Sequence, residues 1–367
     1  MPRLGLPRGW VVAVVALAAF VGLPVPHTVD SVVRGLAASR PVVSPPSGTM
    51  PPVGVLPTTS TTALVPPTTA LPRPVVGERR EAWRWPFSPR SPWNAGVGSA
   101  AGFEDASGAR TAALDRADVT AWVNADQYSM PVYRAVDADP VATVHRAGQP
   151  DVQYRIPNGA RPAGGTDADM HVVDPSGRWA DESWRMQGRN PSWTVGYHQR
   201  VDLWDIGFGT GVRASSASAL GGLIRQWELD RGEIRHALAL AITGSQLAAG
   251  PVWPATSEDG DAAAAYHGAV PMGTYAAIPA AIDVRGLGLS REGVALALAM
   301  QRYGVYVVDR SGAFALYAEP SVHGAQLADL RRDVGVLRGY LRVVTNNGPF
   351  GVNGGGSPTV APAPPFR

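Results

Sequence analysis

Two acidic residues and two histidines are the strongest candidates for chemistry in this sequence. Asp169, His171 and Glu182 lie in one polar stretch, residues 167–187, and His236 follows in an apolar segment. Cleavage of a glycosidic bond needs either two carboxyl groups flanking the bond or a base that removes a proton beside a uronate carboxylate. These four side chains could supply an acid and a base. The alternative is that the polar residues are solvated and His236 is a hydrogen-bonded core residue.

Three aromatic residues near the polar stretch are candidates for substrate binding. Trp184, Trp193 and Tyr197 follow Glu182 closely in the chain. Aromatic rings present a large apolar face together with a polar group, which suits stacking on a sugar ring. We therefore expect them to hold a glycan next to the candidate acid and base.

Metal binding rests on weaker patterns. Asp167, Asp169 and His171 alternate along the chain, and residues 258–261 are acidic, with a composition typical of calcium loops. Neither pattern is a complete ligand signature, so we predict no metal site, with a divalent cation such as calcium left open. The sequence also lacks G-x-S-x-G, P-loop, H-E-x-x-H and Rossmann motifs, which argues against the commonest hydrolase, nucleotide-binding and metalloprotease classes.

A hairpin must position the polar stretch. Residues 174–177 read Asp-Pro-Ser-Gly, a strong turn signal, so the flanking segments should pair as antiparallel strands. If the turn carries a bulge, His171 lies opposite Asp181. Without a bulge, His171 faces Ala180, and Glu182 lies one step along the same face. The sequence does not choose between these registers, because a slip of one residue exchanges the two faces of a strand.

Residues 221–242 are the segment around which the other motifs are arranged. They predict a short polar helix that ends at Gly232, followed by a strand over residues 234–242. In that strand the bulky residues and His236 fall on one face and the alanines on the other. A strand that is apolar on both faces belongs in the middle of a packed sheet, so we expect His236 at or near a core, beside the hairpin.

Many short alternating segments, separated by turn residues, predict an all-β fold with a few short helices, organised as an antiparallel β-sandwich. Residues 79–346 form one folded domain on this interpretation, with the aromatic stretch 83–93 packed onto the sheet. Residues 39–78 are rich in proline and threonine and predict a disordered linker, and residues 347–367 predict a disordered tail rich in glycine and proline.

The N-terminal residues 1–38 carry an export signal. Arg3 and Arg8 precede an apolar run over residues 10–23, which matches a signal peptide and is short for a membrane span. Cleavage and retention as a membrane anchor both remain open, so we expect a protein that is secreted or held on the outer face of the cytoplasmic membrane. The chain has no cysteine and a net charge of +2. These values exclude a disulfide framework and predict no nucleic-acid partner, and we expect a monomer.

The strings LIRQWELDRGEIRHALAL, PMGTY and ALAMQRYGVYVVDRSG carry a resemblance to a known family. The chain resembles a broad, uncharacterised bacterial secreted family with a Gly-x-Ile-x-His-Ala-Leu strand, a Pro-Met-Gly turn, and a helix followed by Tyr-Gly and a hairpin turn. The resemblance covers about residues 91–345 and implies a jelly-roll-like fold, with no reaction attached. Family members have Asp-x-His before the first hairpin, whereas this chain has Asp167-Ala168-Asp169 with the histidine at position 171.

Taken together, these patterns predict a secreted or cell-wall-associated protein that acts on extracellular polysaccharide, as a glycoside hydrolase or a polysaccharide lyase. The alternative is a non-catalytic glycan-binding or structural domain of the cell surface. Acidic residues and a histidine converging in a groove would favour the enzyme, and aromatic residues on a flat face would favour the binding domain.

Overall fold

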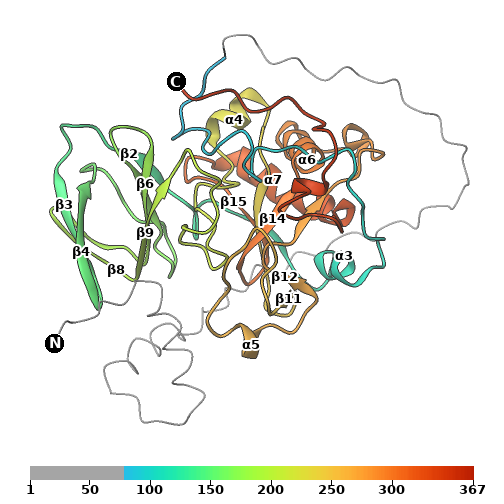
Figure 1. Ribbon diagram of the computed structural model, residues 1–367, viewed down its shortest axis with the longest axis horizontal. Coiled ribbons are helices and arrows are strands. Elements are labelled where there is room, and N and C mark those ends of the chain that lie inside the picture. Colours follow the sequence, from blue (N-terminus) through green and yellow to red (C-terminus); the bar gives the residue numbers. More distant parts are fainter. Residues whose placement is uncertain (1–77) are drawn as a thin grey trace, which may run out of the picture. The chain divides into compact units, whose positions relative to one another are not determined.

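The computed structural model describes residues 78–367 (Figure 1). The predicted signal peptide or anchor at 1–38, and all but the last residue of the predicted linker at 39–78, lie outside the described residues. The described part is mainly β with a few short helices, as predicted from the sequence. Strand orientation differs from the prediction of purely antiparallel pairing, because each sheet contains at least one parallel pair.

The largest sheet has six strands. Their order is β1 (Ala121–Asn124), β15 (Phe314–Tyr317), β10 (Leu238–Ile242), β14 (Val305–Arg310), β13 (Tyr275–Ala277) and β16 (Arg342–Val343). β10 lies inside this sheet, and its two faces enter different apolar clusters, with Leu238, Leu240 and Ile242 on one side and the alanines on the other. The predicted face pattern is therefore confirmed. The strand begins at Leu238, later than predicted, so His236 precedes it.

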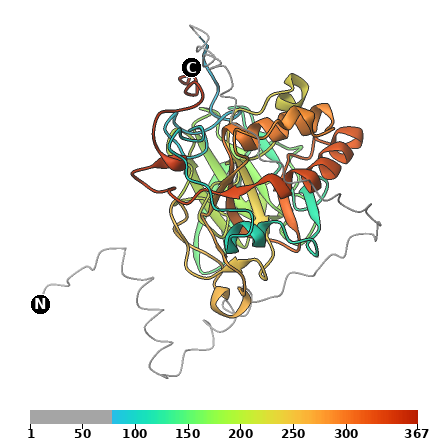
Figure 2. The same ribbon diagram turned by 90° about the vertical axis from the view of Figure 1, so that its right-hand side faces the viewer.

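Two helices cover the face that carries the bulky aliphatic residues. They are α6 (Arg291–Arg302) and α7 (Gly324–Leu337), which lie side by side in Figure 2. Ser290 caps α6, because its hydroxyl accepts a hydrogen bond from the Gly293 N–H at 2.9 Å. The shorter helices are α3 (Ala109–Leu114), α4 (Gln226–Arg231), α5 (Ala262–Ala265) and the 3₁₀ turns η2 (Val284–Gly286), η3 (Arg338–Tyr340) and η4 (Val352–Gly354).

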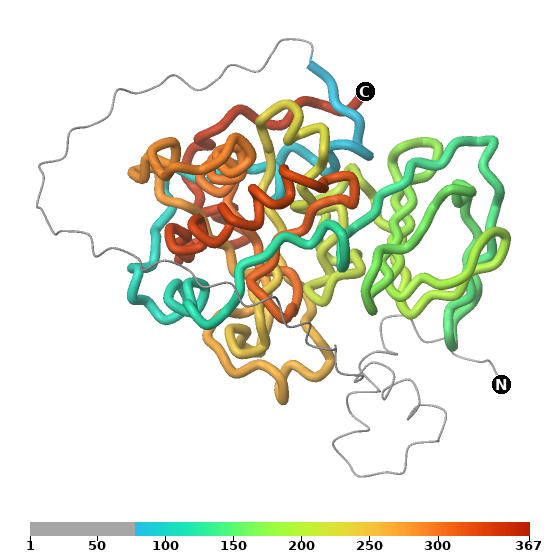
Figure 3. Tube along the Cα trace, turned by 180° about the vertical axis from the view of Figure 1, so that it is seen from behind, coloured from blue at the N-terminus to red at the C-terminus, as the bar shows by residue number. Residues whose placement is uncertain are grey.

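Two four-stranded sheets are built from the chain between residues 130 and 205, which is green in Figure 3. The first has the order β2 (Val132–Arg134), β5 (Met170–Val173), β6 (Trp179–Trp184), β9 (Tyr197–Asp202), and the second β4 (Gln149–Arg155), β3 (Val141–Arg146), β8 (Ser192–Val195), β7 (Gln187–Arg189). One apolar cluster contains residues of both, including Val172 from the first and Val144 and Trp193 from the second. A two-stranded pair, β11 (Leu247–Ala248) and β12 (Val270–Pro271), completes the strands.

The C-terminal residues 347–367, for which the sequence predicts a disordered tail, pack against the domain. Asn353 is fully buried, and its side-chain amide donates hydrogen bonds to the carbonyls of Pro92 at 3.1 Å and Ala95 at 2.6 Å. Near the end of the tail, Phe366 pairs with Arg80 in a β-bridge. The composition suggests disorder because the tail has few bulky apolar residues. Hydrogen bonds to residues 80–100, which we call the N-terminal strap, provide the order that the side chains of the tail do not.

Replacing Asn353 with alanine should lower the free energy of unfolding by about 2–4 kcal/mol. The change removes the hydrogen bonds to the carbonyls of Pro92 and Ala95 and the bond that the Tyr306 hydroxyl donates to Asn353. It also puts alanine at a φ of 54°, where asparagine is tolerated better. Urea denaturation measures the change. Phe350→Ala, in the same tail but fully exposed, is the control and should change stability by less than about 0.5 kcal/mol.

Candidate functional site

Strands β5 and β6 form the predicted hairpin, but neither predicted register is correct. His171 lies directly opposite Glu182, and Val173 lies opposite Ala180. The Asp174 N–H donates to the Trp179 carbonyl at 2.8 Å, so the loop is longer than either prediction assumed. The register without a bulge still has the correct faces, because it puts His171 and Glu182 on the same side of the hairpin.

Glu182 is fully buried on the face of the hairpin that packs toward the six-stranded sheet. Its carboxylate accepts hydrogen bonds from the backbone N–H groups of Ala219 at 3.0 Å and Val212 at 3.2 Å, and from the Ser218 hydroxyl. Burial raises the pKa of Glu182, and these hydrogen bonds and the nearby Arg213 charge offset this only in part. A carboxyl group enclosed in this way organises the loop at 211–219 and has no contact with solvent.

His171 is also fully buried. Its Nε2 lies 3.3 Å from the sulfur of Met130, and its Nδ1 has no hydrogen-bond partner among the described residues. Burial and the Arg213 charge lower the pKa of His171 to about 3, so the ring is neutral at physiological pH. Asp169, just before β5, is 4% exposed. The structure thus brings His171 and Glu182 face to face, but it seals both from substrate.

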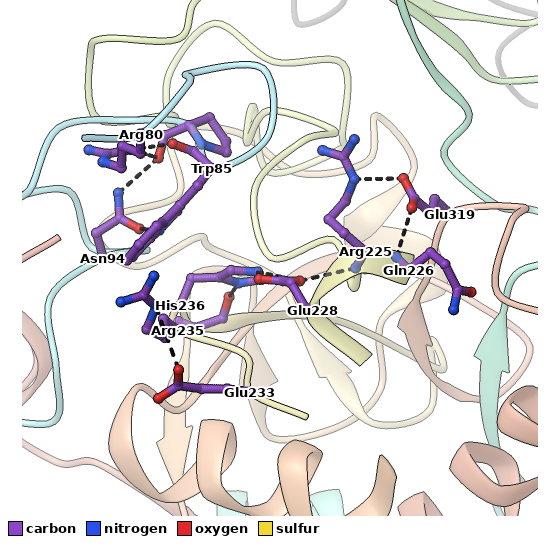
Figure 4. A network of polar contacts seen from close by, with 12 residues as sticks. Arg80, Trp85, Asn94, Arg225, Gln226, Glu228, Glu233, Arg235, His236 and Glu319 are labelled. Atoms are coloured by element: carbon purple, nitrogen blue, oxygen red, sulfur yellow. Dashed lines mark hydrogen bonds and ion pairs between the residues drawn. The ribbon is translucent and has the colours of Figure 1, made fainter. Parts of the chain in front are cut away.

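His236 belongs to a second buried network (Figure 4). Its Nε2 is 3.1 Å from a carboxylate oxygen of Glu228, and its Nδ1–H donates to the Ala237 carbonyl at 2.8 Å. Glu228 also accepts a hydrogen bond from the backbone N–H of Arg225 at 3.0 Å, at the start of α4. Burial lowers the pKa of His236, but the charge and hydrogen bond of Glu228 outweigh it, so the pKa is raised above its usual value.

The His236 network and the hairpin are not joined by direct contacts. No hydrogen bond or ion pair within residues 78–367 connects His236 to His171 or Glu182, and each has its own partners. His236 does line a cavity of about 10 Å³, together with Trp85, Asn94 and Arg225 among others. A space of this size holds about one water molecule and excludes a sugar. The structure therefore does not assemble the predicted set of four residues as an open site.

The three predicted stacking residues have different environments. Trp193 is 3% exposed within the cluster of the four-stranded sheets, and its indole N–H donates to the Asn190 side chain at 3.0 Å, so it cannot stack on a sugar. Tyr197 is 40% exposed and lies opposite the half-buried Trp184 across β6 and β9. Only Trp184 and Tyr197 thus remain accessible as an aromatic pair.

The opposite face of the same hairpin carries a pair that the sequence analysis did not single out. Asp181 pairs with His198 of β9, whose Nε2 is 3.1 Å from the aspartate Oδ1. The second carboxylate oxygen of Asp181 accepts a hydrogen bond from Arg200 at 2.8 Å. From the sequence, Asp181 is predicted only as a partner for His171 in the register with a bulge. The signal available in the sequence was the alternation in β6, which puts Asp181 and Glu182 on opposite faces.

The Asp181–His198 pair lines a groove of about 440 Å³. We call this space the β4–β9 groove, after the strands that supply most of its lining. Its lining residues are Arg146, Val152, Gln153, Asp181, His198, Gln199 and Arg200. Two guanidinium groups, two amides and an imidazole therefore face one carboxylate, and the volume is within the range of about 300–1,000 Å³ typical of ligand sites.

The described residues contain no group of three or more histidine or acidic side chains arranged to hold a metal ion. In the acidic loop, Glu258 accepts a hydrogen bond from the Gly250 N–H, and Asp261 pairs with Arg310 at 3.0 Å. The prediction made from the sequence, no metal site with a divalent cation such as calcium left open, stays a prediction. Among residues 78–367, none of the helices has the length and apolar character that a membrane span requires.

Comparisons with known proteins do not assign this chain to a family. The chain matches no protein-family model, no curated protein and no solved structure. The β4–β9 groove and its residues are therefore the basis for a proposed function.

Proposed function

We propose that the protein acts on extracellular polysaccharide and that the β4–β9 groove binds an acidic glycan chain. The observation that carries this proposal is the lining of the groove, in which Arg146 and Arg200 face a single aspartate, Asp181. The formal charges of Arg146, Arg200 and Asp181 sum to one positive charge. Guanidinium groups bind carboxylates through paired, charge-assisted hydrogen bonds, so a uronate fits this groove better than a neutral sugar does.

Arg146 is the group best placed to bind a carboxylate. Its Nε donates to the Pro150 carbonyl at 2.7 Å, and within residues 78–367 it forms no ion pair with an acidic side chain. Arg200 differs, because it is already paired with Asp181 at 2.8 Å and lies 3.4 Å from Asp174. The amides of Gln153 and Gln199 can bond to sugar hydroxyl groups as donors and acceptors.

A non-catalytic glycan-binding domain is the second candidate function. The exposed ring of Tyr197 and the adjacent Trp184 favour it, because aromatic side chains at a sheet surface can stack on sugar rings without any reaction. Gln199 links this pair to the groove, since its amide donates to the Tyr197 hydroxyl at 2.5 Å. A glycan bound in the groove can therefore extend onto the aromatic pair in either case.

We also propose a cellular location and a β-sandwich architecture for the protein. An exported chain, either cleaved after its N-terminal segment 1–38 or anchored by it, would carry the groove beyond the membrane on the spacer 39–78. The apolar cluster shared by the two four-stranded sheets supports a β-sandwich of the jelly-roll-like kind that the family resemblance implies. We propose a monomer, no nucleic-acid partner and no required cofactor.

Binding of polyuronates by the full chain tests this function. Calorimetry with a polyuronate should give binding that weakens at high salt, and a neutral glucan should bind much more weakly. Arg146→Ala should weaken polyuronate binding by about 10-fold, the effect of losing one charge-assisted hydrogen bond of about 1.5 kcal/mol. Arg189→Ala is the matched control, because Arg189 is exposed on β7 and does not line the groove. Equal affinity for neutral and acidic glycans would contradict the proposal.

A further inference from the structure

His198 is held in one tautomer and one orientation. Asp181 is a hydrogen-bond acceptor when ionised, so the proton of the neutral imidazole lies on Nε2, 3.1 Å from the Asp181 Oδ1. The ring of Tyr154 stacks against the imidazole, with centroids 5.7 Å apart and an interplanar angle of 19°. These contacts leave Nδ1 with a free lone pair, and no described residue donates a hydrogen bond to it.

The groove does not have the groups that glycosidic hydrolysis usually needs. Hydrolysis by the common mechanisms requires two carboxyl groups about 5–9.5 Å apart. The lining of the β4–β9 groove contains one, Asp181, and both of its oxygens are already engaged by His198 and Arg200. Glu182 is adjacent in sequence, but it lies on the other face of the hairpin and is fully buried. What the groove offers instead is a base beside cationic groups.

We propose that the groove cleaves uronate-containing chains by β-elimination, with His198 as the catalytic base. This inference rests on the proposed function and deepens it, because it names the reaction and the substrate class. His198 Nδ1 takes the proton from C5 of the uronate, the electron pair forms the C4–C5 double bond, and the C4–O glycosidic bond breaks. The protonated His198 returns the proton to the departing oxygen. The products are a new reducing end and an unsaturated uronate, and no water is consumed.

The arginines make the C5 proton removable. Negative charge builds up on the uronate carboxylate when C5 loses its proton, and a guanidinium bound to that carboxylate stabilises the charge where it develops. Arg146 is assigned this role because it has no acidic partner within residues 78–367. Asp181 acts through His198 as a positioning residue: it fixes the tautomer and stabilises the imidazolium that forms, while Arg200 holds the aspartate in place.

The test uses the full chain with polyuronates built from galacturonate, glucuronate, and mannuronate with guluronate, beside neutral glycans. Ultraviolet absorbance detects the unsaturated ends, and mass spectrometry shows whether water was added. We expect unsaturated ends from at least one polyuronate, and a loss of about 10²- to 10⁴-fold in rate for His198→Ala. Added imidazole should restore part of that rate, which a purely structural role for His198 would not explain. Asp181→Asn should lower the rate and alter its pH profile while polyuronate binding persists.

The outcomes distinguish a failure of the proposed β-elimination from a failure of the proposed binding of polyuronates. Polyuronate binding without unsaturated ends on any substrate overturns the β-elimination and leaves the binding function standing. Products that have gained water, or a His198→Ala variant that cleaves at the full rate, also overturn the inference. Failure to bind any polyuronate overturns the proposed function itself. Calorimetric binding by each variant verifies that its groove is folded, and Arg189→Ala should cleave like the unsubstituted protein.

Discussion

Glu228→Gln should lower the free energy of unfolding by about 3–5 kcal/mol below pH 6.5, the expected cost of removing one partner from a buried ion pair. In the unsubstituted protein, the Glu228 charge raises the pKa of His236 above its usual value against the effect of burial. A raised pKa in the folded state adds stability that is fully present below the unfolded pKa of about 6.5 and is lost as pH rises through the folded value.

The variant should reverse this pH dependence. Without the Glu228 charge, burial and the Arg225 charge both act to lower the pKa of His236. The folded protein then resists protonation, so its stability should fall as pH drops below about 6.5. Denaturation with urea at several pH values, followed by circular dichroism, measures both effects. A constant difference between the two proteins across this range would contradict the assignment of a charged pair.

Glu233→Gln is the matched control for Glu228→Gln. Glu233 lies close by in the chain and is 3.8 Å from Arg235, but its side chain is 43% exposed (Figure 4). Exposed ion pairs contribute about 0–1 kcal/mol, because water screens them. We therefore expect a small change in stability and no reversal of the pH dependence for this control.

Trp93→Ala should lower the free energy of unfolding by about 3–5 kcal/mol, the usual cost of truncating a buried aromatic residue. Trp93 is 1% exposed, stacks on Phe208 with ring centroids 4.8 Å apart, and meets Tyr306 edge-on at 5.6 Å. Its backbone carbonyl also accepts a hydrogen bond from the Ala237 N–H at 2.7 Å, which ties the N-terminal strap to the segment before β10. Urea denaturation followed by circular dichroism measures the loss.

Two further substitutions show whether the buried volume of Trp93 is the cause. Trp93→Phe keeps most of the apolar contact and loses the indole hydrogen bond to the Gly207 carbonyl, so it should cost less than Trp93→Ala. Trp204→Ala removes a ring of the same size that is 45% exposed, and it should also cost less. An equal loss for Trp93→Ala and Trp204→Ala would show that the strap contributes no more than a surface contact.

Several local features could be predicted because they depend on neighbouring residues. Gly232 ends α4 with a φ of 74°, a left-handed conformation that glycine adopts without strain. The alternation of bulky residues and alanines in β10 follows from the two-residue period of a strand, and the aromatic strap around Trp93 is buried as predicted. In each case the pattern and its cause lie within a few residues of one another.

The candidate site could not be predicted in the same way. His198 and Asp181 come from different strands. They meet because Asp181 is aligned with Arg200 across β6 and β9, and His198 lies two residues from Arg200 on the same face of β9. The sequence suggested Glu182 and His171 instead. His171, Asp181, Glu182 and His198 all lie in polar, alternating strand segments, so the local sequence does not distinguish them. Both faces of the hairpin are buried, and residues distant in sequence decide what packs against each face and where a groove remains.

The amino-acid sequence by itself determined that this chain forms a mainly β domain, that β10 is apolar on both faces and that a hairpin joins residues 170–184. Only the tertiary structure decided that one face of this hairpin buries His171 and Glu182, while the other packs toward the second four-stranded sheet and puts the largely buried Asp181 and His198 in the lining of the β4–β9 groove. Strand period and turn chemistry are local and can be read along the chain. Solvent access belongs to the assembled sheets, because it depends on residues that are distant in sequence.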